Sequence, residues 1–202
     1  YLNSYFSTGI KNLIDHAVLE YGEKNGVRTD VADYTKIDEI PFDYDRRRMS
    51  VVIQGSDGQH WLISKGAAEE IIRICSFVRK NEQDIPLEET AKQNILENAA
   101  MLGEEGMHVI AVAEKHEQID VATFSGADEK DMTFLGYVAF LDPPKPDVEK
   151  AVSELYEAGV DVKVLSGDAE PVVANICSQV GIRREAAMTG EQVEALDDAA
   201  LK

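Results

Sequence analysis

The stretch MSVVIQGSDGQHWLISKG, residues 49–66, decides the fold of the first part of this chain. Residues 49–53 and 61–64 are rich in apolar and β-branched side chains, which favours two strands. Between them, Gly55-Ser56-Asp57-Gly58 is typical of a tight turn. The stretch therefore predicts a β-hairpin, and Lys65-Gly66 follows where its second strand ends.

Helical and extended patterns alternate around this hairpin, which Ile37, Ile40 and Phe42 precede as a lead-in strand. Apolar residues at helical spacing mark the helices, and short apolar runs mark the strands. The further expected elements are helices at residues 8–23, 67–75 and 87–102 and strands at residues 109–113 and 133–141. This mixture predicts an α+β domain over residues 1–141, an antiparallel sheet with flanking helices.

The pattern changes near residue 141. Asp142-Pro143-Pro144-Lys145 predicts a stiff connector, because consecutive prolines fit neither a helix interior nor a central strand. A helix, a strand at residues 160–165 and a second helix at residues 171–180 follow, in the order typical of a parallel sheet. We therefore expect a second domain, an α/β fragment, in residues 142–202.

Composition excludes several classes of function. The net charge of −18 argues against binding of DNA or RNA and against docking on an anionic membrane. No run of about 18 apolar residues occurs, so we expect no direct membrane insertion of this chain. Four histidines and two cysteines, Cys75 and Cys177, show no metal-ligand spacing, so we predict no metal site built from them.

The turn Leu165-Ser166-Gly167-Asp168 lies between a predicted strand and a predicted helix, where α/β sheets place ligand chemistry. One hypothesis is that the Ser166 hydroxyl and nearby backbone N–H groups hold a phosphoryl oxygen. The alternative is structural: Asp168 caps the following helix and Ser166 completes a turn.

Two further positions allow the same pair of interpretations. Lys65 with Gly66 fits the mouth of a ligand pocket or, equally, a solvated strand end, and no Walker A loop is present. Phe42 lies near Arg46-Arg47-Arg48. It is either a core residue or a stacking platform for a base, and the arginines either face phosphates or form a solvated turn.

Five short motifs carry a resemblance to a known family. They are Phe-x-x-x-x-Arg-Arg-Met-Ser-Val at residues 42–51, Lys-Gly-Ala-x-Glu at 65–69, Gly-x-x-Val-x-Ala-Val-Ala at 106–113, Asp-Pro-Pro-Lys at 142–145 and Ser-Gly-Asp at 166–168. Their order resembles that of P-type cation-transporting ATPases over essentially the whole chain, and residues 36–43 and 46–52 look most like the bacterial magnesium-transporting members. The resemblance implies a nucleotide-binding domain followed by part of a haloacid-dehalogenase-like phosphorylation domain.

The resemblance also implies roles for single residues in the first domain. Phe42 would stack on adenine, Arg47 would contact the nucleotide, and Lys65 with Gly66 would line the ATP pocket. Asp15 would help to hold the base or ribose side.

His108 stands where members often carry an arginine that reaches the phosphates, which puts phosphate affinity there in doubt. In the second domain, Ser166, Gly167 and Asp168 would support phosphate and Mg²⁺.

The family's phosphorylated Asp-Lys-Thr-Gly-Thr sequence does not occur in these 202 residues. We therefore expect this chain to bind ATP without hydrolysing it. The intact protein would be a membrane pump that uses an aspartyl-phosphate to transport a divalent cation, with Mg²⁺ favoured. This part would lie on the cytoplasmic face, beside the rest of the phosphorylation domain and the actuator and transmembrane domains. Two alternatives are a haloacid-dehalogenase-type phosphatase with a large cap and a non-catalytic nucleotide-binding module.

Overall fold

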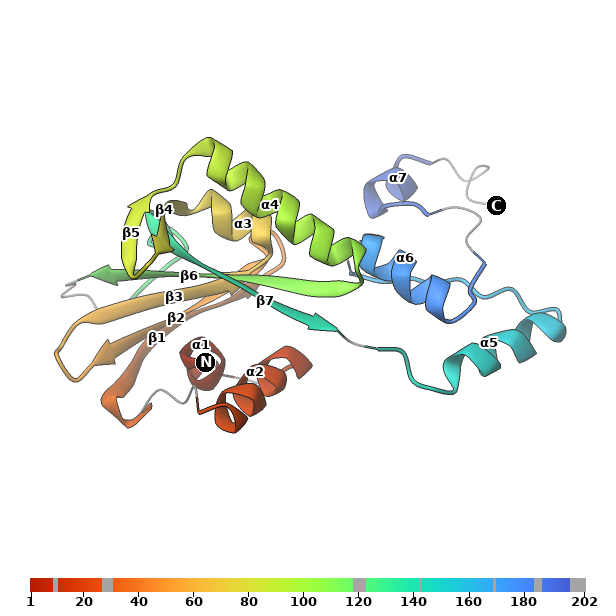
Figure 1. Cartoon of the computed structure of the whole chain (residues 1–202), viewed down its shortest axis with the longest axis horizontal. Helices are drawn as coiled ribbons and strands as arrows, with labels where there is room; N and C mark the ends of the chain where they lie inside the picture. Colours follow the sequence, from red (N-terminus) through yellow and green to blue (C-terminus); the bar gives the residue numbers. More distant parts are fainter. Residues whose placement is uncertain are drawn as a thin grey trace. The chain divides into compact units, whose positions relative to one another are not determined.

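The computed structural model describes residues 1–8, 11–26, 31–117, 123–141, 143–168, 170–183 and 187–196. The chain divides into two compact units. Unit 1 comprises Tyr1–Ala99 and Val109–Phe140, and unit 2 comprises Ala100–His108 and Leu141–Lys202. Figure 1 traces the elements of both units in chain order.

One seven-stranded sheet runs in the order β1-β2-β3-β6-β7-β4-β5. Its strands are β1 (Tyr34–Asp43), β2 (Arg48–Gly55), β3 (His60–Gly66), β4 (Cys75–Lys80), β5 (Gln83–Pro86), β6 (Met107–Glu117) and β7 (Met132–Leu141). The predicted hairpin is confirmed as β2 and β3, which pair antiparallel. The prediction of a wholly antiparallel sheet is wrong, because β4 pairs parallel with β7. A long connection through a helix and β6 separates these two strands, as a parallel pair requires.

Helices cover both faces of this sheet (Figure 1). They are α1 (Leu2–Phe6) and α2 (Leu13–Lys24) on one face and α3 (Ala68–Arg73) and α4 (Glu89–Glu104) on the other, with a short 3₁₀ turn at η1 (Val31–Asp33). Val51 and Ile53 of β2 pack with Leu2 of α1. The residue between them, Val52, belongs to the cluster that includes Ile71 of α3.

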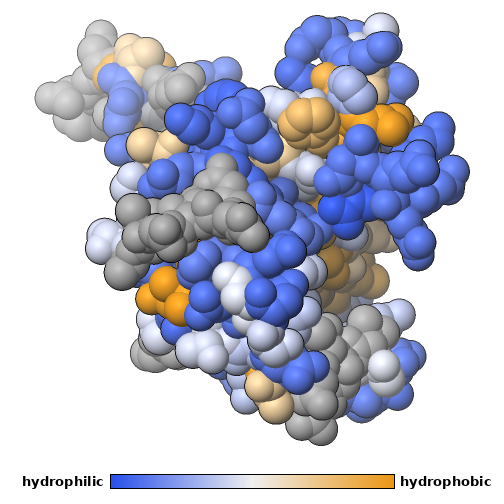
Figure 2. Space-filling view, turned by 90° about the vertical axis from the view of Figure 1, so that its left-hand side faces the viewer, coloured by the Kyte–Doolittle hydropathy of each residue, from blue (hydrophilic) through white to orange (hydrophobic). Residues whose placement is uncertain are grey.

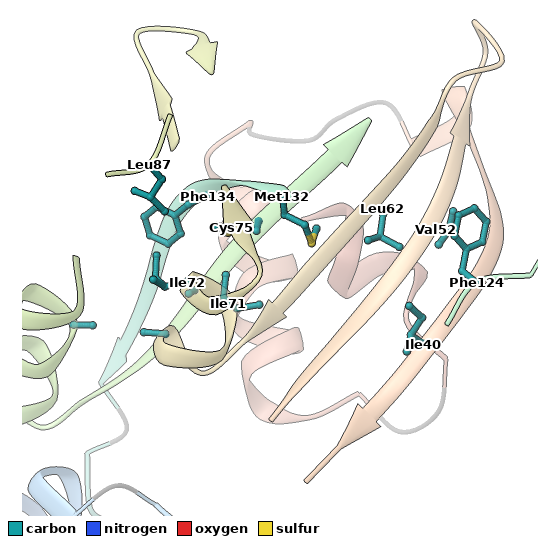
Figure 3. Packing of buried hydrophobic residues seen from close by; sticks show 14 residues of the cluster. Ile40, Val52, Leu62, Ile71, Ile72, Cys75, Leu87, Phe124, Met132 and Phe134 are labelled. Carbon is teal, nitrogen blue, oxygen red and sulfur yellow. The ribbon is translucent and has the colours of Figure 1, made fainter. Parts of the chain in front are cut away.

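Burial on both faces explains why the middle of β2 is continuously apolar. Val51, Val52 and Ile53 are all fully buried, whereas a strand with one solvated face would alternate with polar residues. Figure 3 shows the larger cluster, in which Ile71 and Met132 lie close to the apolar side chains of the strands.

The helix boundaries follow local signals. Asn12 caps α2, since its side chain accepts a hydrogen bond from the Asp15 backbone N–H at 2.8 Å. The helix predicted at residues 8–23 therefore begins at Leu13, five residues later than predicted. The helix predicted at residues 87–102 continues through Gly103 and ends at Glu104. Gly106, with a φ of 87°, follows the end of that helix.

The sequence did not reveal the β4–β5 hairpin. Lys80 pairs with Gln83, so the loop consists of Asn81 and Glu82 alone. Both loop residues have positive φ, at 51° and 64°, the conformation of a type I′ turn. The usual sequence signal for this turn is Asn-Gly, and glutamate in the second position concealed it.

Glu82→Gly should therefore stabilise unit 1, by about 0.5–1 kcal/mol, because glycine adopts positive φ without steric cost. Urea unfolding followed by the fluorescence of Trp61, the single tryptophan of the chain, measures the change. Lys80→Gly, one strand residue away, should instead destabilise. Equal effects of the two substitutions would contradict the turn.

Unit 2 contains α5 (Val148–Glu157), α6 (Glu170–Gln179) and α7 (Gly190–Glu194). The strand expected at residues 160–165 does not form, and Leu165 is 99% exposed. A strand is completed by hydrogen bonds to a neighbour, and none of the seven strands in the described ranges pairs with this segment. The predicted connector begins at Asp142, which lies outside the described residues.

The exposed side chains on the face in Figure 2 are mainly hydrophilic, with small apolar patches between them. This agrees with the high content of charged residues, 29% of the chain. Among the residues placed by the structure, no helix has both the length and the apolar content needed to span a membrane.

Candidate functional site

Three strand ends meet at one end of the sheet in unit 1. Met49 at the start of β2 pairs with Lys65 at the end of β3. At the end of β1, Asp43 pairs with Arg48. The β1–β2 register shifts between Ile40, which pairs with Ser50, and Asp43. Pro41 and Phe42 therefore both lie opposite Met49, as in a β-bulge. The register thus brings Phe42, Met49 and Lys65 into one row, here called the sheet-end row.

A cavity of about 240 Å³ opens beside this row in unit 1. Its walls are mainly apolar and include Ile14 and Val18 of α2 and Ile110 and Val112 of β6. Of the predicted site residues, all of which the structure describes, Lys65 lines the cavity and the others do not. Sites that enclose a whole drug-sized ligand occupy about 300–1,000 Å³, so this cavity has room for only part of a ligand of that size.

Lys65 is not a solvated lysine. Its ammonium group pairs with the Asp15 carboxylate and lies 3.2 Å from the Ser4 hydroxyl oxygen. The side chains of Lys65 and Asp15 are only 11% and 6% exposed. Burial by itself would raise the pKa of Asp15, but hydrogen bonds from Lys65 and Ser4 outweigh burial and hold that pKa below its ordinary value of 3.8. A buried, paired charge therefore stands at the cavity wall.

Gly66 is required by the backbone of β2. A Cβ atom on Gly66 would lie 2.4 Å from the Arg47 carbonyl oxygen and 2.7 Å from Arg48 Cα. The same Arg47 carbonyl accepts a hydrogen bond from the Ala67 N–H at 3.0 Å. The close approach that the sequence assigned to a ligand is made here by the protein's own chain.

The three consecutive arginines have different partners. Arg46 and Arg48 both bind the buried Glu129 carboxylate, at 2.7 Å each. Arg47 is 53% exposed and lies 3.2 Å from a carboxylate oxygen of Glu70. The triplet is therefore neither a solvated turn nor a set of three arginines that face a ligand. Of the three, Arg47 is the one that presents its side chain to solvent beside the sheet-end row.

Phe42 is not a core residue. Its side chain is 53% exposed, and its ring meets Tyr44 edge-to-face, with centroids 5.3 Å apart. Tyr44 is still more exposed, at 88%. An aromatic ring with an open face at the end of the row can stack on a planar ligand.

The remaining predicted residues lie in unit 2. The Ser166 hydroxyl donates to the Asp168 carboxylate at 2.9 Å, and the Asp168 backbone N–H donates to the Ser166 oxygen at 3.1 Å. Ser166, Gly167 and Asp168 line a groove of about 1,080 Å³ in this unit. His108 Nδ1 lies 3.9 Å from an Asp168 carboxylate oxygen. The structure therefore brings Ser166, Asp168 and His108 together within unit 2.

Sequence reasoning missed three residues in or against these strands. Met49 is between Phe42 and Lys65, and the predicted hairpin register could have placed it there. Ser4 and Glu129 carry no local signal, because each reaches the strands from an element distant in the sequence.

Comparison with known proteins identifies the family. Residues 7–147 match the family described as P-type ATPase, cytoplasmic domain N. Over 198 residues, 98% of this chain, the sequence is 41% identical to the magnesium-transporting ATPase, P-type 1, of Escherichia coli (strain K12). It is 40% identical over 201 residues to the protein of the same name from Salmonella typhimurium (strain 14028s).

A more distant relative is the human calcium-transporting ATPase type 2C member 1, which is 27% identical over 90% of this chain. The chain spans 22% of the length of each magnesium-transporting relative and 19% of the calcium-transporting one. The match over residues 7–147 and the similarity over nearly the whole chain together establish that this protein belongs to the P-type ATPases and contains their cytoplasmic domain N.

Proposed function

We propose that this chain binds ATP, as the nucleotide-binding part of a pump that transports a divalent cation. The observation that carries the proposal is the buried Lys65–Asp15 pair at the wall of an apolar cavity, within a domain of this family. Apolar walls with a few placed polar groups are the usual construction of a site for a nucleotide base. Family membership favours a pump over the phosphatase and the non-catalytic module that the sequence left open.

In the proposed complex, the open face of Phe42 stacks on adenine and Met49 lies beside the base. Lys65, oriented by Asp15, donates toward the base or ribose, and Gly66 keeps the two strand ends close together. Arg47 reaches the phosphates. With Arg47 as the cation proposed for the phosphates, few charges hold the triphosphate.

We propose that residues 142–202 begin the phosphorylation domain, an α/β fragment of haloacid-dehalogenase type. Ser166 and Asp168 supply oxygen ligands, which Mg²⁺ prefers. Within the described ranges, no three His, Cys, Asp or Glu side chains are grouped to hold a metal ion. Ser166 and Asp168 would therefore hold Mg²⁺ only together with phosphate oxygens, with the Gly167 backbone close by.

The transported ion and the setting are inferred from the relatives. The proteins at about 40% identity are magnesium-transporting ATPases, so Mg²⁺ is the proposed cargo. ATP hydrolysis would proceed through an aspartyl-phosphate elsewhere in the intact protein, at the cytoplasmic face of the cell membrane. The actuator, transmembrane and remaining phosphorylation domains would be its partners.

Calorimetric titration with ATP, with and without Mg²⁺, tests the proposal. We expect saturable binding without phosphate release. Phe42→Ala should weaken binding roughly five- to 150-fold, since base–aromatic stacking contributes about 1–3 kcal/mol. Tyr21→Ala is the matched control, because Tyr21 is an exposed aromatic on α2 outside the row. No saturable binding at millimolar ATP would refute the proposal.

A further inference from the structure

Glu129 is a buried carboxylate that makes no contact with the nucleotide in the proposed site. Its side chain is fully buried. It accepts hydrogen bonds from Arg46 Nη1 at 2.9 and 2.7 Å, from Arg48 Nε at 2.7 Å and from the Ser50 hydroxyl at 2.7 Å. A second hydroxyl, that of Ser64, lies 2.6 Å from Ser50 Oγ. Such a fully partnered buried charge fixes the groups around it in one arrangement.

The groups that Glu129 fixes lie on either side of Arg47. Arg47 has a φ of 44°, a conformation that L-amino acids other than glycine rarely adopt. Its N–H donates to the Asp43 carbonyl at 2.7 Å, and its carbonyl accepts from Ala67 at 3.0 Å. A residue in such a conformation persists only where its surroundings hold it, and the anchored Arg46 and Arg48 are those surroundings.

This arrangement separates Arg47 from its neighbours. Because Arg46 and Arg48 are both committed to Glu129, Arg47 is the arginine of the triplet whose guanidinium is half exposed. Arg46 also donates to the Pro41 carbonyl at 2.9 Å, one residue before Phe42. Through Arg46 and Arg48, Glu129 thus fixes the segment between the exposed Phe42 ring and the exposed Arg47 guanidinium.

We propose that Glu129 is a positioning residue of the nucleotide site and that it acts through Arg47. Glu129 does not touch the nucleotide. It holds the backbone turn that carries Arg47, whose guanidinium lies 3.2 Å from Glu70 and 3.7 Å from Glu69 and would exchange these contacts for phosphate. A fixed turn leaves less motion to be lost when the nucleotide binds. This inference rests on the proposed function.

A double-mutant cycle on the full 202-residue chain tests the inference, with ATP affinity as the readout. Glu129→Gln keeps the size of the side chain but removes the charge that anchors Arg46 and Arg48. We expect it to raise the Kd for ATP roughly five- to tenfold, as expected for loss of one oriented contact to a charged group. In an Arg47→Ala background, the same change should alter the Kd less than twofold.

Asp84→Asn is the matched control. Asp84 pairs with Arg79 and accepts from Thr133 at 3.0 Å, so this change also breaks an ion pair, but outside the sheet-end row. It should leave the Kd unchanged. If Glu129→Gln does not fold, Ser50→Ala removes one donor to Glu129 and serves in the same cycle, with a smaller effect in the same direction.

If Glu129 served only the stability of the fold, Glu129→Gln would raise the Kd for ATP by the same factor with Arg47 present and with Arg47 replaced by alanine. That result would overturn the inference. An unchanged Kd in Glu129→Gln or in Arg47→Ala alone would overturn it as well, while the proposed function would stand. Absence of ATP binding by the unchanged chain would refute the proposed function, and the inference with it.

Discussion

Lys65→Met should lower the free energy of unfolding of unit 1 by about 3–5 kcal/mol at neutral pH, the usual result of removing one partner of a buried ion pair. The Asp15 carboxylate is only 6% exposed and would lose both the ammonium charge and its hydrogen bond. Urea unfolding followed by Trp61 fluorescence measures the loss. The double variant Lys65→Met/Asp15→Asn should recover much of it, because no uncompensated charge remains.

The loss of stability caused by Lys65→Met should become smaller as the pH falls. In the unchanged chain, the pKa of Asp15 lies below its ordinary value of 3.8, so the ionised pair stabilises the fold above that pH and the contribution is lost as pH falls through the folded pKa. Without Lys65, the hydrogen bonds from Ser4 and Asn12 still lower the pKa of Asp15, but the larger contribution of the ammonium group is lost. The pKa of Asp15 is then higher than in the unchanged chain, and protonation at low pH relieves the buried charge. The difference between the two proteins should therefore shrink as the pH falls toward and below 3.8.

Lys24→Met provides the control for that prediction. Lys24 pairs with Glu20 on α2, but both side chains are largely exposed, so the change should leave stability unaltered within error. A loss from Lys65→Met no larger than that from Lys24→Met would show that the Lys65–Asp15 pair does not support the fold.

Gly66→Ala should destabilise unit 1 by about 2–3 kcal/mol, because the added methyl group overpacks a site that is closed by backbone atoms. The Arg47 carbonyl oxygen would lie 2.4 Å from the new Cβ, and it is held there by its hydrogen bond to Ala67. Since the strand ends must separate to make room, the affinity for ATP should fall as well. Chemical denaturation and titration of the same sample measure both effects.

Gly103→Ala is the comparison for Gly66→Ala. Gly103 lies inside α4, and a Cβ there would meet no atom within 4 Å. Alanine within a helix stabilises by up to about 1 kcal/mol relative to glycine. If both substitutions changed stability in the same direction, the steric argument for Gly66 would be wrong.

The fold could be predicted from the sequence where the pattern was local. The β2–β3 hairpin was visible because its turn residues and apolar runs are adjacent in the chain. The β4–β5 hairpin was not, because Asn81 and Glu82 adopt positive φ without the glycine that normally signals it. The parallel β4–β7 pair joins segments about 55 residues apart, as in Cys75 with Met132, and such pairings leave no periodic trace.

Prediction of the site from the sequence has the same limit, because it also depends on contacts between residues that are distant in the chain. Lys65 and Gly66 could be selected from the hairpin and Phe42 from the strand before it, and the family is confirmed by the comparisons, but their nucleotide roles stay predictions. What the sequence could not show is which charges meet. Asp15 was chosen by resemblance for the nucleotide, whereas in the structure its carboxylate is bound to Lys65. Glu129 was not chosen at all, since nothing local distinguishes it from the other acidic residues.

The segment that carries the sheet-end row also has a consequence for transplanting the site between P-type ATPases. Residues 42–66 carry Phe42, Arg47, Met49 and Lys65 on one continuous segment, but both of its buried counter-charges, Asp15 and Glu129, come from outside that segment. A chimera that exchanges residues 42–66 alone would retain its fold only if the recipient has carboxylates at those two places. The unit of exchange is therefore this segment together with two distant acidic residues.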